Sequence, residues 1–412
     1  MTLVGQANRT LILALLCVAS FAVVFNNLII TPILPDISDD LGISVGVAGL
    51  LVTAYAMVGG IAAIFSGPII DRLGRKPVVV VGMSILAVAT VLSAIAPTFG
   101  LLMASRALAG LGVACLTPAV FSAVGDYFAW EERGRAMSWV ITANTSASIL
   151  GVPAGALVSG LFSWRITFTL LAALCLLFTF LLFTKLPGEQ KREAGAPTPG
   201  MGAILQVLRD KPTAMAIYSS HMATCYWFVI ITYVGAYYRD EFGVSKSALG
   251  VVTMLMGVGV LIGSNVGGRL SDRIGKRPVI VATSAACAGL AILEMNAPWL
   301  LAAAPLMLVF GAFGGARFAT HQAVLTEMRP QSRGTVMALN AAGQQFGIVL
   351  GSAIGGLVLS QFNYGALGFA SAVLALVSLF TYSLFVDEKR FTQGAEAPGM
   401  GERVEVAAAG AK

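Results

Sequence analysis

The sequence predicts an all-helical integral membrane protein whose twelve spanning helices form two six-helix bundles. Of its 412 residues, 57% are hydrophobic and only 11% are charged, whereas soluble domains carry about 25% charged residues. The apolar residues gather in runs of about 20, long enough to cross the hydrocarbon core as helices. The short alternating segments of a membrane barrel are absent from the sequence. These observations exclude a water-soluble enzyme.

Twelve apolar stretches follow one another along the chain. They lie near residues 11–34, 45–68, 78–96, 98–124, 136–160, 165–185, 212–238, 247–269, 279–296, 298–324, 335–360 and 365–386. The first stretch is too long for a signal peptide and lacks a clear small-residue cleavage site, so we interpret it as helix 1.

The basic residues predict which side of the membrane the loops face. Of the 26 Lys and Arg, three fall in odd-numbered loops (Arg165, Arg239 and Lys246) and two inside spans, which leaves 21 for the tails and even-numbered loops. By the positive-inside rule both termini are therefore cytoplasmic, in a multi-pass protein of the cell membrane, most simply the bacterial inner membrane. Basic loops facing an anionic leaflet also explain the net charge of +6 without nucleic acid as a partner.

The sequence indicates no metal, disulfide or cofactor. All five cysteines (Cys17, Cys115, Cys175, Cys225 and Cys287) fall within spans, and none forms a CxxC pair. No GxxxxGK[ST] run is present, so any transport has to be driven by an ion gradient or by the gradient of the substrate.

The chain is internally duplicated at an offset of about 200 residues. Residues 71–77 read DRLGRKP and residues 272–278 read DRIGKRP, each directly after the second span of a half. Self-similarity at a fixed offset indicates two copies of one structural unit. We therefore divide the chain into an N-terminal bundle (1–186), a Pro- and Gly-rich cytoplasmic linker (187–211), a C-terminal bundle (212–386) and a polar, disordered tail (387–412).

Small residues recur every four positions on four of the helices. The ladders are Gly59, Ala63 and Gly67 on helix 2; Ala147, Gly151 and Gly155 on helix 5; Gly259, Gly263 and Gly267 on helix 8; and Gly347, Gly351 and Gly355 on helix 11. Membrane helices associate where small residues let their backbones approach. We expect these four helices to form the seams between the two halves.

Several motifs resemble those of the major facilitator superfamily over the whole chain. Gly67 and the DRLGRK run after it are similar to the superfamily's loop signature, and residues 106–110 (RALAG) resemble its helix 4 motif. Residues 151–155 (GVPAG) are similar to the helix 5 motif of antiporters. Residues 31–35 (TPILP) and Trp164-Arg165 resemble the twelve-helix branch that exports drugs, sugars and nucleosides. The resemblance implies the major facilitator fold.

The acidic residues depart from that branch. Many proton-driven members place Asp or Glu within helix 1 or helix 4, whereas helix 1 here carries Asn26 and Asn27. No acidic residue lies at mid-span. The candidates for carrying a proton are therefore His321, His221 and, near a span end, Asp126.

Two arginines lie inside spans, where a charge costs at least about 2.5 kcal/mol. Arg106 is expected to face the cavity if the helix 4 resemblance holds; alternatively, helix 1 carbonyls and the side chains of Asn26 and Asn27 satisfy it. Arg317 and His321 are spaced i, i+4 and share one face of helix 10. His321 either loads a proton or is a hydrogen-bonded packing residue.

Further polar and aromatic residues are candidates for the substrate cavity. The aromatics are Tyr226, Trp227 and Tyr233 of helix 7, and the amides are Asn144, Asn340, Gln344 and Gln345. They either bind substrate or bridge helices. Together with one or two arginines, such a lining suits sugars, nucleosides, amphenicol-like drugs and organic anions about equally. Two arginines facing the cavity without carboxylates disfavour lipophilic cations, which need an acidic counter-charge.

The signature loops predict a latch on the cytoplasmic side. Asp71 is placed to cap the start of helix 11, by resemblance near Gly334, where the helix dipole favours an anion. The loop bases pair with acids such as Asp126, Glu131 and Glu132. We assign the latch to Gly67, Asp71, Arg72, Gly74, Arg75, Lys76, Arg133, Asp272 and Arg273.

The sequence favours a secondary active transporter that exports a small organic compound, a drug, sugar, nucleoside or related metabolite, in exchange for protons. It is expected to work as a monomer in the lipid bilayer by alternating access. The alternative is a facilitator or proton-coupled importer of a small polar or anionic metabolite; a non-transporting membrane sensor is more distant. An intramembrane enzyme is disfavoured because His321 has no Asp, Glu or Cys one turn away.

Overall fold

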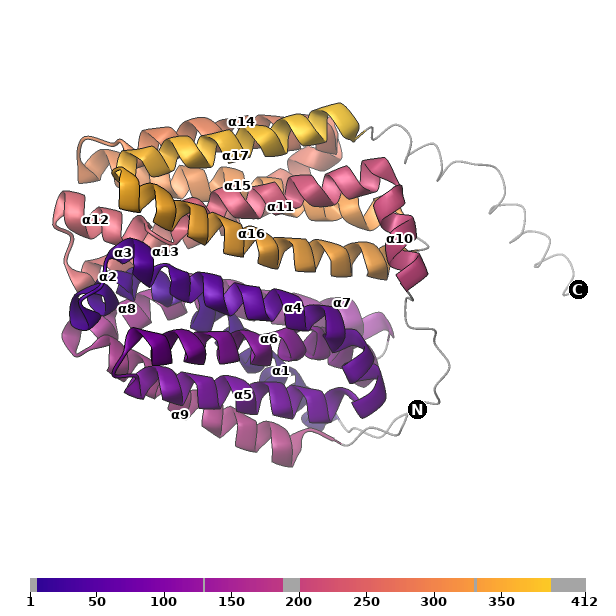
Figure 1. The fold of residues 1–412 in the computed structure, drawn as a ribbon. Coiled ribbons are helices and arrows are strands. Elements are labelled where there is room, and N and C mark those ends of the chain that lie inside the picture. The colour runs from indigo at the N-terminus through magenta and orange to yellow at the C-terminus, as the bar shows by residue number, and fades with distance from the viewer. Residues whose placement is uncertain (1–5, 129, 188–200, 330–331, 387–412) are drawn as a thin grey trace, which may run out of the picture.

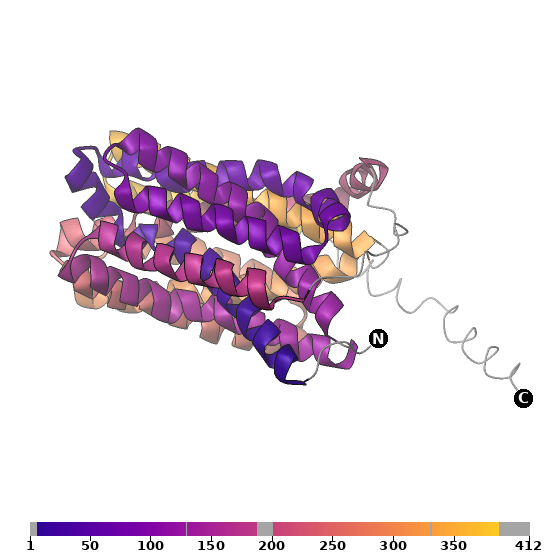
Figure 2. The ribbon, with the colours of Figure 1, turned by 90° about the horizontal axis from the view of Figure 1, so that it is seen from below.

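The chain folds into two bundles of long helices. The computed structural model describes residues 6–128, 130–187, 201–329 and 332–386. These residues contain helices and no strand, and twelve helical segments among them are long and apolar enough to cross a membrane. The predicted all-helical, twelve-span class is confirmed. Figure 1 shows the two bundles side by side, and the view turned by 90° in Figure 2 shows their long helices along a common axis.

Six spans build the first bundle. Their elements are α1 (Gln6–Leu28) with α2 (Ile30–Leu41), α3 (Val45–Ala48) with α4 (Leu50–Leu73), α5 (Arg75–Ile95), α6 (Phe99–Tyr127), α7 (Trp130–Ser146) with the π-helix η1 (Ala147–Gly151) and α8 (Val152–Leu161), and α9 (Trp164–Lys185). The first candidate span ends at Leu28, before the predicted end at residue 34, and the separate helix α2 follows it with Pro35 inside.

Six spans also build the second bundle. They are α11 (Lys211–Ile231) with α12 (Val234–Phe242), α13 (Lys246–Ile274), α14 (Lys276–Met295), α15 (Leu300–Met328), α16 (Arg333–Gln361) and α17 (Tyr364–Phe385). The predicted linker contains a further helix, α10 (Met201–Arg209), which contacts α11 and α16. Residues 188–200 of the linker and the predicted tail lie outside the described residues.

The positive-φ glycines repeat the duplication in the backbone. Gly42 and Gly243 end helices in the left-handed region, with φ of 62° and 63°. Gly74 and Gly275 connect the two helices of each signature loop, with φ of 85° and 92°. Both pairs are separated by 201 residues. Because residues with a Cβ atom rarely adopt these backbone conformations, each half needs glycine at the same two turns.

The four helices expected to form the seams do meet in pairs across the halves, but their glycine ladders pack mainly within the halves. A Cβ on Gly263 would overlap the backbone of Ala312 in α15, and Gly155 faces Ile29, between α1 and α2. Gly351 faces Cys225 of α11. Small residues on a helix permit close approach on that face, but the sequence does not say which neighbour uses it.

Other residues of the same helices form the contact between the halves. A Cβ on Gly250 of α13 would lie 2.7 Å from Pro153 Cα in α8, and one on Gly46 would lie 2.9 Å from the carbonyl oxygen of Gly356 in α16. Helices 2 and 11 and helices 5 and 8 therefore do meet across the halves, as expected. Their contact uses residues nearer one end of the molecule.

The two ends of the molecule differ. α1 begins and α17 ends at the same end, which we call the terminal end (Figure 1). At the opposite end lie α2, α3 and α12, and here the halves touch; we call it the closed end.

All five cysteines are free thiols. Among the described residues no group of three His, Cys, Asp or Glu side chains could hold a metal ion.

Candidate functional site

A cavity of about 450 Å³ lies between the two halves. The first half contributes α1, α2, α7, η1 and α8, and the second contributes α11, α13, α15 and α16. Of the predicted cavity residues, the lining contains Asn144, Tyr226, Trp227, Arg317, Gln344 and Gln345, and it contains the proton-carrying candidate His321. It also contains Gln322, which the sequence did not single out, and no Asp or Glu of the described residues.

Arg317 lies in the wall of the cavity and is 3% exposed. Its Nε donates to Ser284 Oγ (2.8 Å), and its Nη2 donates to Ser378 Oγ (2.6 Å) and Ser219 Oγ (3.1 Å). The three serines belong to α14, α17 and α11, so three helices fix the position of the guanidinium group. Neutral hydroxyl groups, and no carboxylate among the described residues, hold this buried cation.

His321 lies one turn after Arg317 and is 2% exposed. Its ring tilts against that of Tyr382, with the centroids 5.6 Å apart. The Ala216 carbonyl faces the imidazole, but neither ring nitrogen meets hydrogen-bond geometry with a described residue. An unpaired buried imidazole in a cavity wall is free to accept a proton or to bind a ligand.

The predicted aromatics divide between the cavity and the interface of the halves. Trp227 stacks on Phe310 at 4.9 Å and 12°, is half-buried and lines the cavity. Gly314 makes this possible, because a Cβ there would overlap the indole ring. Tyr233 lies outside the lining; its hydroxyl donates to the Ser352 carbonyl (2.7 Å) near the closed end.

The amides also divide. Asn144 accepts a 2.6 Å hydrogen bond from Ser20, and Gln344 Nε2 has no partner among the described residues. Asn340 lies outside the lining and donates to Gln322 Oε1 (3.0 Å). Asn340 thus links α16 to a lining residue of α15.

Arg106 contacts helix 1 and does not line the cavity. It is fully buried, and it donates to Asn26 Oδ1 (2.6 Å) and to the Asn26 carbonyl (3.1 Å). Asn26 in turn donates to Thr90 (3.0 Å), and the Tyr55 ring lies 4.8 Å from the guanidinium carbon. Arg106, Asn26 and Asn27 are not among the lining residues. The alternative expected from sequence, an arginine satisfied by helix 1, describes this geometry.

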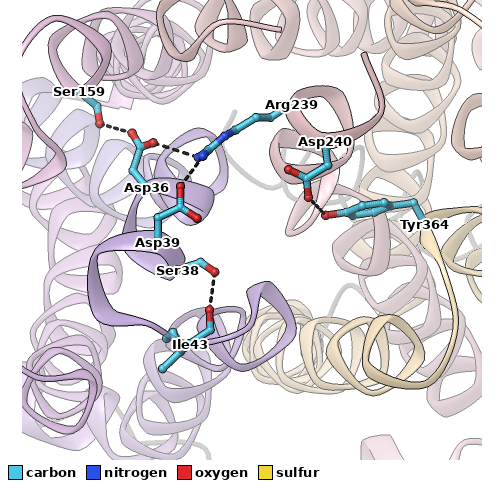
Figure 3. Close-up of polar contacts among 8 residues, drawn as sticks. All are labelled: Asp36, Ser38, Asp39, Ile43, Ser159, Arg239, Asp240 and Tyr364. Carbon is cyan, nitrogen blue, oxygen red and sulfur yellow. Dashed lines mark hydrogen bonds and ion pairs between the residues drawn. The ribbon is translucent and has the colours of Figure 1, made fainter. Parts of the chain in front are cut away.

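A polar cluster at the closed end joins the halves and was missed in the sequence. Arg239 of α12 donates to Asp36 (3.2 Å) and to Asp39, both on α2, and Asp36 also accepts from Ser159 of α8 (2.8 Å) (Figure 3). Thr53 and Ser352 add a 2.7 Å hydrogen bond between α4 and α16. The available signal was charge complementarity: one odd-numbered loop carries Asp36, Asp39 and Asp40, and two of the few basic residues in odd-numbered loops are Arg165 and Arg239.

Glu294, near the end of α14, is a second residue that the sequence did not single out as a site. It is fully buried, and neither carboxylate oxygen has a partner among the described residues. The hydroxyl group of Tyr237 in α12 donates to the Glu294 carbonyl (2.8 Å). The residue therefore lies in the bundle beside the helix that carries Arg239.

Part of the predicted latch can be located. Arg75 Nε lies 2.9 Å from Asp126, and the equivalent residues of the second half, Lys276 and Glu327, also pair. Asp126 thus faces a cation at the terminal end. The surroundings of six other residues lie outside the description. They are Gly67, Asp71, Arg72, Glu131, Arg133 and Gly334.

The remaining predicted residues have simple surroundings. Lys76 is half-buried, Gly74 forms the turn described above, and Asp272 and Arg273 are exposed. His221 donates from Nδ1 to the Gly343 carbonyl. In the helix 5 motif, Gly151 and Gly155 pack against α1, while Pro153 meets Gly250 across the halves.

Two helical bundles that share a central cavity and touch at one end define a multi-pass membrane transport protein. Comparison with known proteins agrees with this class. The sequence profile described as Major Facilitator Superfamily matches residues 16–237 and 218–408. The chain belongs to this superfamily, whose members are transporters and not enzymes.

Relatives in bacteria match nearly the whole chain. The chloramphenicol resistance protein of Streptomyces lividans is 28% identical and covers 89% of this chain and 94% of its own length. The inner membrane transport protein YdhP of Escherichia coli is 26% identical, with 84% and 88% covered. The uncharacterised transporter YceJ of Bacillus subtilis is also 26% identical, with 88% and 93% covered.

Solved structures share the fold. A bacterial homologue of the human lysosomal transporter Spinster, in its inward-facing, unoccupied conformation, superposes with a TM-score of 0.75 at 18% sequence identity. The match covers 96% of this chain and all of the other. At this identity the comparison establishes the architecture alone.

Proposed function

We propose that the protein exports a small organic compound by alternating access, in exchange for protons, and works as a monomer. The observation that carries this proposal is the cavity of about 450 Å³ that both halves line. The halves meet at the closed end through α2 and α12 and through α4 and α16. Rocking about such a cavity exposes it first to one side of the membrane and then to the other.

We infer that the terminal end faces the cytoplasm of a bacterial inner membrane. In support, 21 of the 26 Lys and Arg fall in the tails and even-numbered loops, and the positive-inside rule places such loops in the cytoplasm. A relative, YdhP, is named an inner membrane transport protein. In this orientation the contacts at the closed end separate the cavity from the outside, so an exporter would load its substrate in this conformation.

The lining favours substrates with a flat apolar part. Trp227 offers a partly open indole face, and Gln322, Gln344 and Gln345 offer amides. Two relatives are named for drug resistance, one to chloramphenicol and one to multiple drugs. Chloramphenicol, a small aromatic amide, is therefore a suitable first substrate for transport assays.

The signature loops act in this proposal as the latch of the opposite conformation. Arg75 with Asp126 and Lys276 with Glu327 hold each loop against its own half. Asp71 would then close the terminal end against helix 11 when the cavity faces outward. Asp71→Asn should leave insertion normal and reduce transport; unchanged transport in everted vesicles would remove the latch from the mechanism.

The alternative is a facilitator or proton-coupled importer, which the asparagines at positions 26 and 27 favour because they cannot titrate. Liposomes that contain the purified protein and a pH-sensitive dye separate the readings. Under antiport, chloramphenicol added outside alkalinises an acid-loaded lumen as protons leave in exchange. Under proton-coupled import the lumen acidifies, and a facilitator moves the drug without any change in pH. Absence of drug flux and of any pH change, compared with protein-free liposomes, would favour the non-transporting sensor.

A further inference from the structure

Arg317 is a buried cation without a counter-charge. It is 3% exposed, and among the described residues no Asp or Glu lines the cavity beside it. Salt bridges of the described residues involve other basic side chains and not Arg317. A lone charge inside a membrane bundle is costly and marks a functional site when it faces a cavity. A bound ligand can supply the negative charge that the described residues do not.

The hydrogen bonds of Arg317 leave one nitrogen of the guanidinium group, Nη1, free. Nε and Nη2 are engaged by Ser284, Ser219 and Ser378, whereas Nη1 makes no hydrogen bond to a described residue. Nη1 is also absent from the enclosed, unpaired polar atoms, so it keeps access to open space. The serines thus orient the group rigidly and leave two N–H donors for a ligand.

Two other polar side chains of the cavity, His321 and Gln344, also have nitrogen atoms without hydrogen-bond partners among the described residues. Neither ring nitrogen of His321 meets hydrogen-bond geometry with a described residue, and Nε2 of Gln344 is buried without a partner among them. Both residues line the same cavity. Buried donors of this kind are satisfied when a ligand with acceptor oxygens enters.

An apolar platform lies on the same face of the cavity. Trp227 packs on Gly314, three residues before Arg317 on α15, and its stacking on Phe310 fixes the ring. A flat group can therefore lie near the indole while its charged end reaches the guanidinium. A carboxylate oxygen accepts a strong, charge-assisted hydrogen bond from an arginine N–H group.

We propose that the cavity binds organic anions, with the carboxylate of an aromatic acid held by Arg317 Nη1 and its ring beside Trp227. This substrate class rests on the proposed function, in which the cavity is the transport site. Arg106 shows the contrast: it is equally buried, but Asn26 accepts from both of its Nη groups, the Tyr55 ring lies against the guanidinium group, and it lies outside the cavity.

Titration calorimetry on the purified protein with three matched probes tests the proposal. The probes are 2-naphthoate, the neutral 2-naphthamide and the cationic 2-naphthylmethylammonium. We expect naphthoate to bind at least about tenfold more tightly than the amide, because a hydrogen bond to a charged group contributes about 1.5–3 kcal/mol. The ammonium probe should bind most weakly. Equal binding of acid and amide, a preference for the ammonium probe, or no binding of naphthoate at its solubility limit would overturn the proposal.

Arg317→Gln should remove the preference for naphthoate while naphthamide still binds, and Arg317→Lys should keep part of it. Arg269→Gln, at an exposed site on α13, is the charge-matched control. If Arg317→Gln does not fold, the three-probe comparison on the unmodified protein remains decisive.

Counterflow of naphthoate in liposomes separates this proposal from the transport function. Binding that depends on Arg317 without flux would disprove transport and leave the anion site. Flux of the amide without any preference for the acid would support transport and disprove the anion site.

Discussion

At the scale of residues, two buried arginines differ in what satisfies them. Arg106 is held by Asn26, whose side chain is itself fixed by Thr90. Arg317 is held by serines and keeps a free donor toward the cavity. The sequence shows both as intramembrane charges, and burial alone does not distinguish them. Their hydrogen-bond partners separate a structural arginine from one available to a ligand.

The role of Asn26 can be tested against its neighbour. Asn26→Ala removes the acceptor of a buried charged donor and should destabilise the protein by about 1.5–3 kcal/mol. Asn27→Ala should change stability by less than about 0.5 kcal/mol, because Asn27 Oδ1 already lacks a partner. Thermal unfolding in detergent compares the two variants. Equal losses would show that Arg106 does not depend on Asn26.

His321 remains the best placed candidate for carrying a proton. If it does, His321→Gln should abolish transport driven by a pH gradient while substrate counterflow continues, because a glutamine side chain cannot titrate. His221→Gln is the control, since its ring donates to the Gly343 carbonyl and lies outside the cavity lining. Both activities are measured in the same liposomes. Retention of gradient-driven transport in His321→Gln would exclude the role.

At the scale of elements, close approach between helices is controlled by individual glycines. α13 packs along α15 through Gly259, Gly263 and Gly267, each of which would place a Cβ into the backbone of α15. Gly268, on another face of α13, has nothing within 4 Å of that position. One helix thus carries glycines required for packing and a glycine that is not.

This difference predicts opposite effects of the same substitution. Gly263→Ala should lower the unfolding temperature because α15 has to move away and lose its contacts. Gly268→Ala should leave stability unchanged or raise it by up to about 1 kcal/mol, the difference in helix propensity. Scanning calorimetry or a thermal-shift assay measures both. A loss at Gly268 as large as at Gly263 would contradict the packing described.

At the scale of the whole molecule, the halves are held together at one end. Arg239 joins α12 to Asp36 and Asp39 of α2, and Thr53 joins α4 to Ser352 of α16. Arg165 makes an ion pair of similar kind with Asp40, but both of its partners lie in the first half. Of these contacts, those of Arg239 and Thr53 oppose separation of the halves, and the Arg165–Asp40 pair does not.

Arg239→Gln should therefore shift the equilibrium toward opening of the closed end. The coupling expected for a partly buried pair is about 1–3 kcal/mol, or roughly 5- to 150-fold in the ratio of conformations. Spin labels at the exposed positions Leu101 and Leu301, one in each half, report the distance. Longer distances should appear in Arg239→Gln and not in the control Arg165→Gln. An identical distribution in both would remove the gating role of Arg239.

The sequence by itself determined the class of the protein, because that class depends on local properties. Runs of about 20 apolar residues have to be helices in a bilayer, and the repeated loops at 71–77 and 272–278 revealed the duplicated bundle. The spacing of Arg317 and His321 also placed them on one face, since helical periodicity is fixed.

Only the tertiary structure decided which of these residues share a site. It placed Arg317, His321 and Trp227 in one cavity wall, moved Arg106 and Tyr233 out of it, and brought Asp36 to Arg239 across 203 positions of the chain. Each depends on which helix faces which, and helices that are apolar on all sides carry little periodic signal to specify their neighbours. The partner of a side chain in a membrane bundle is therefore set by the packing of the helices, which local sequence does not encode.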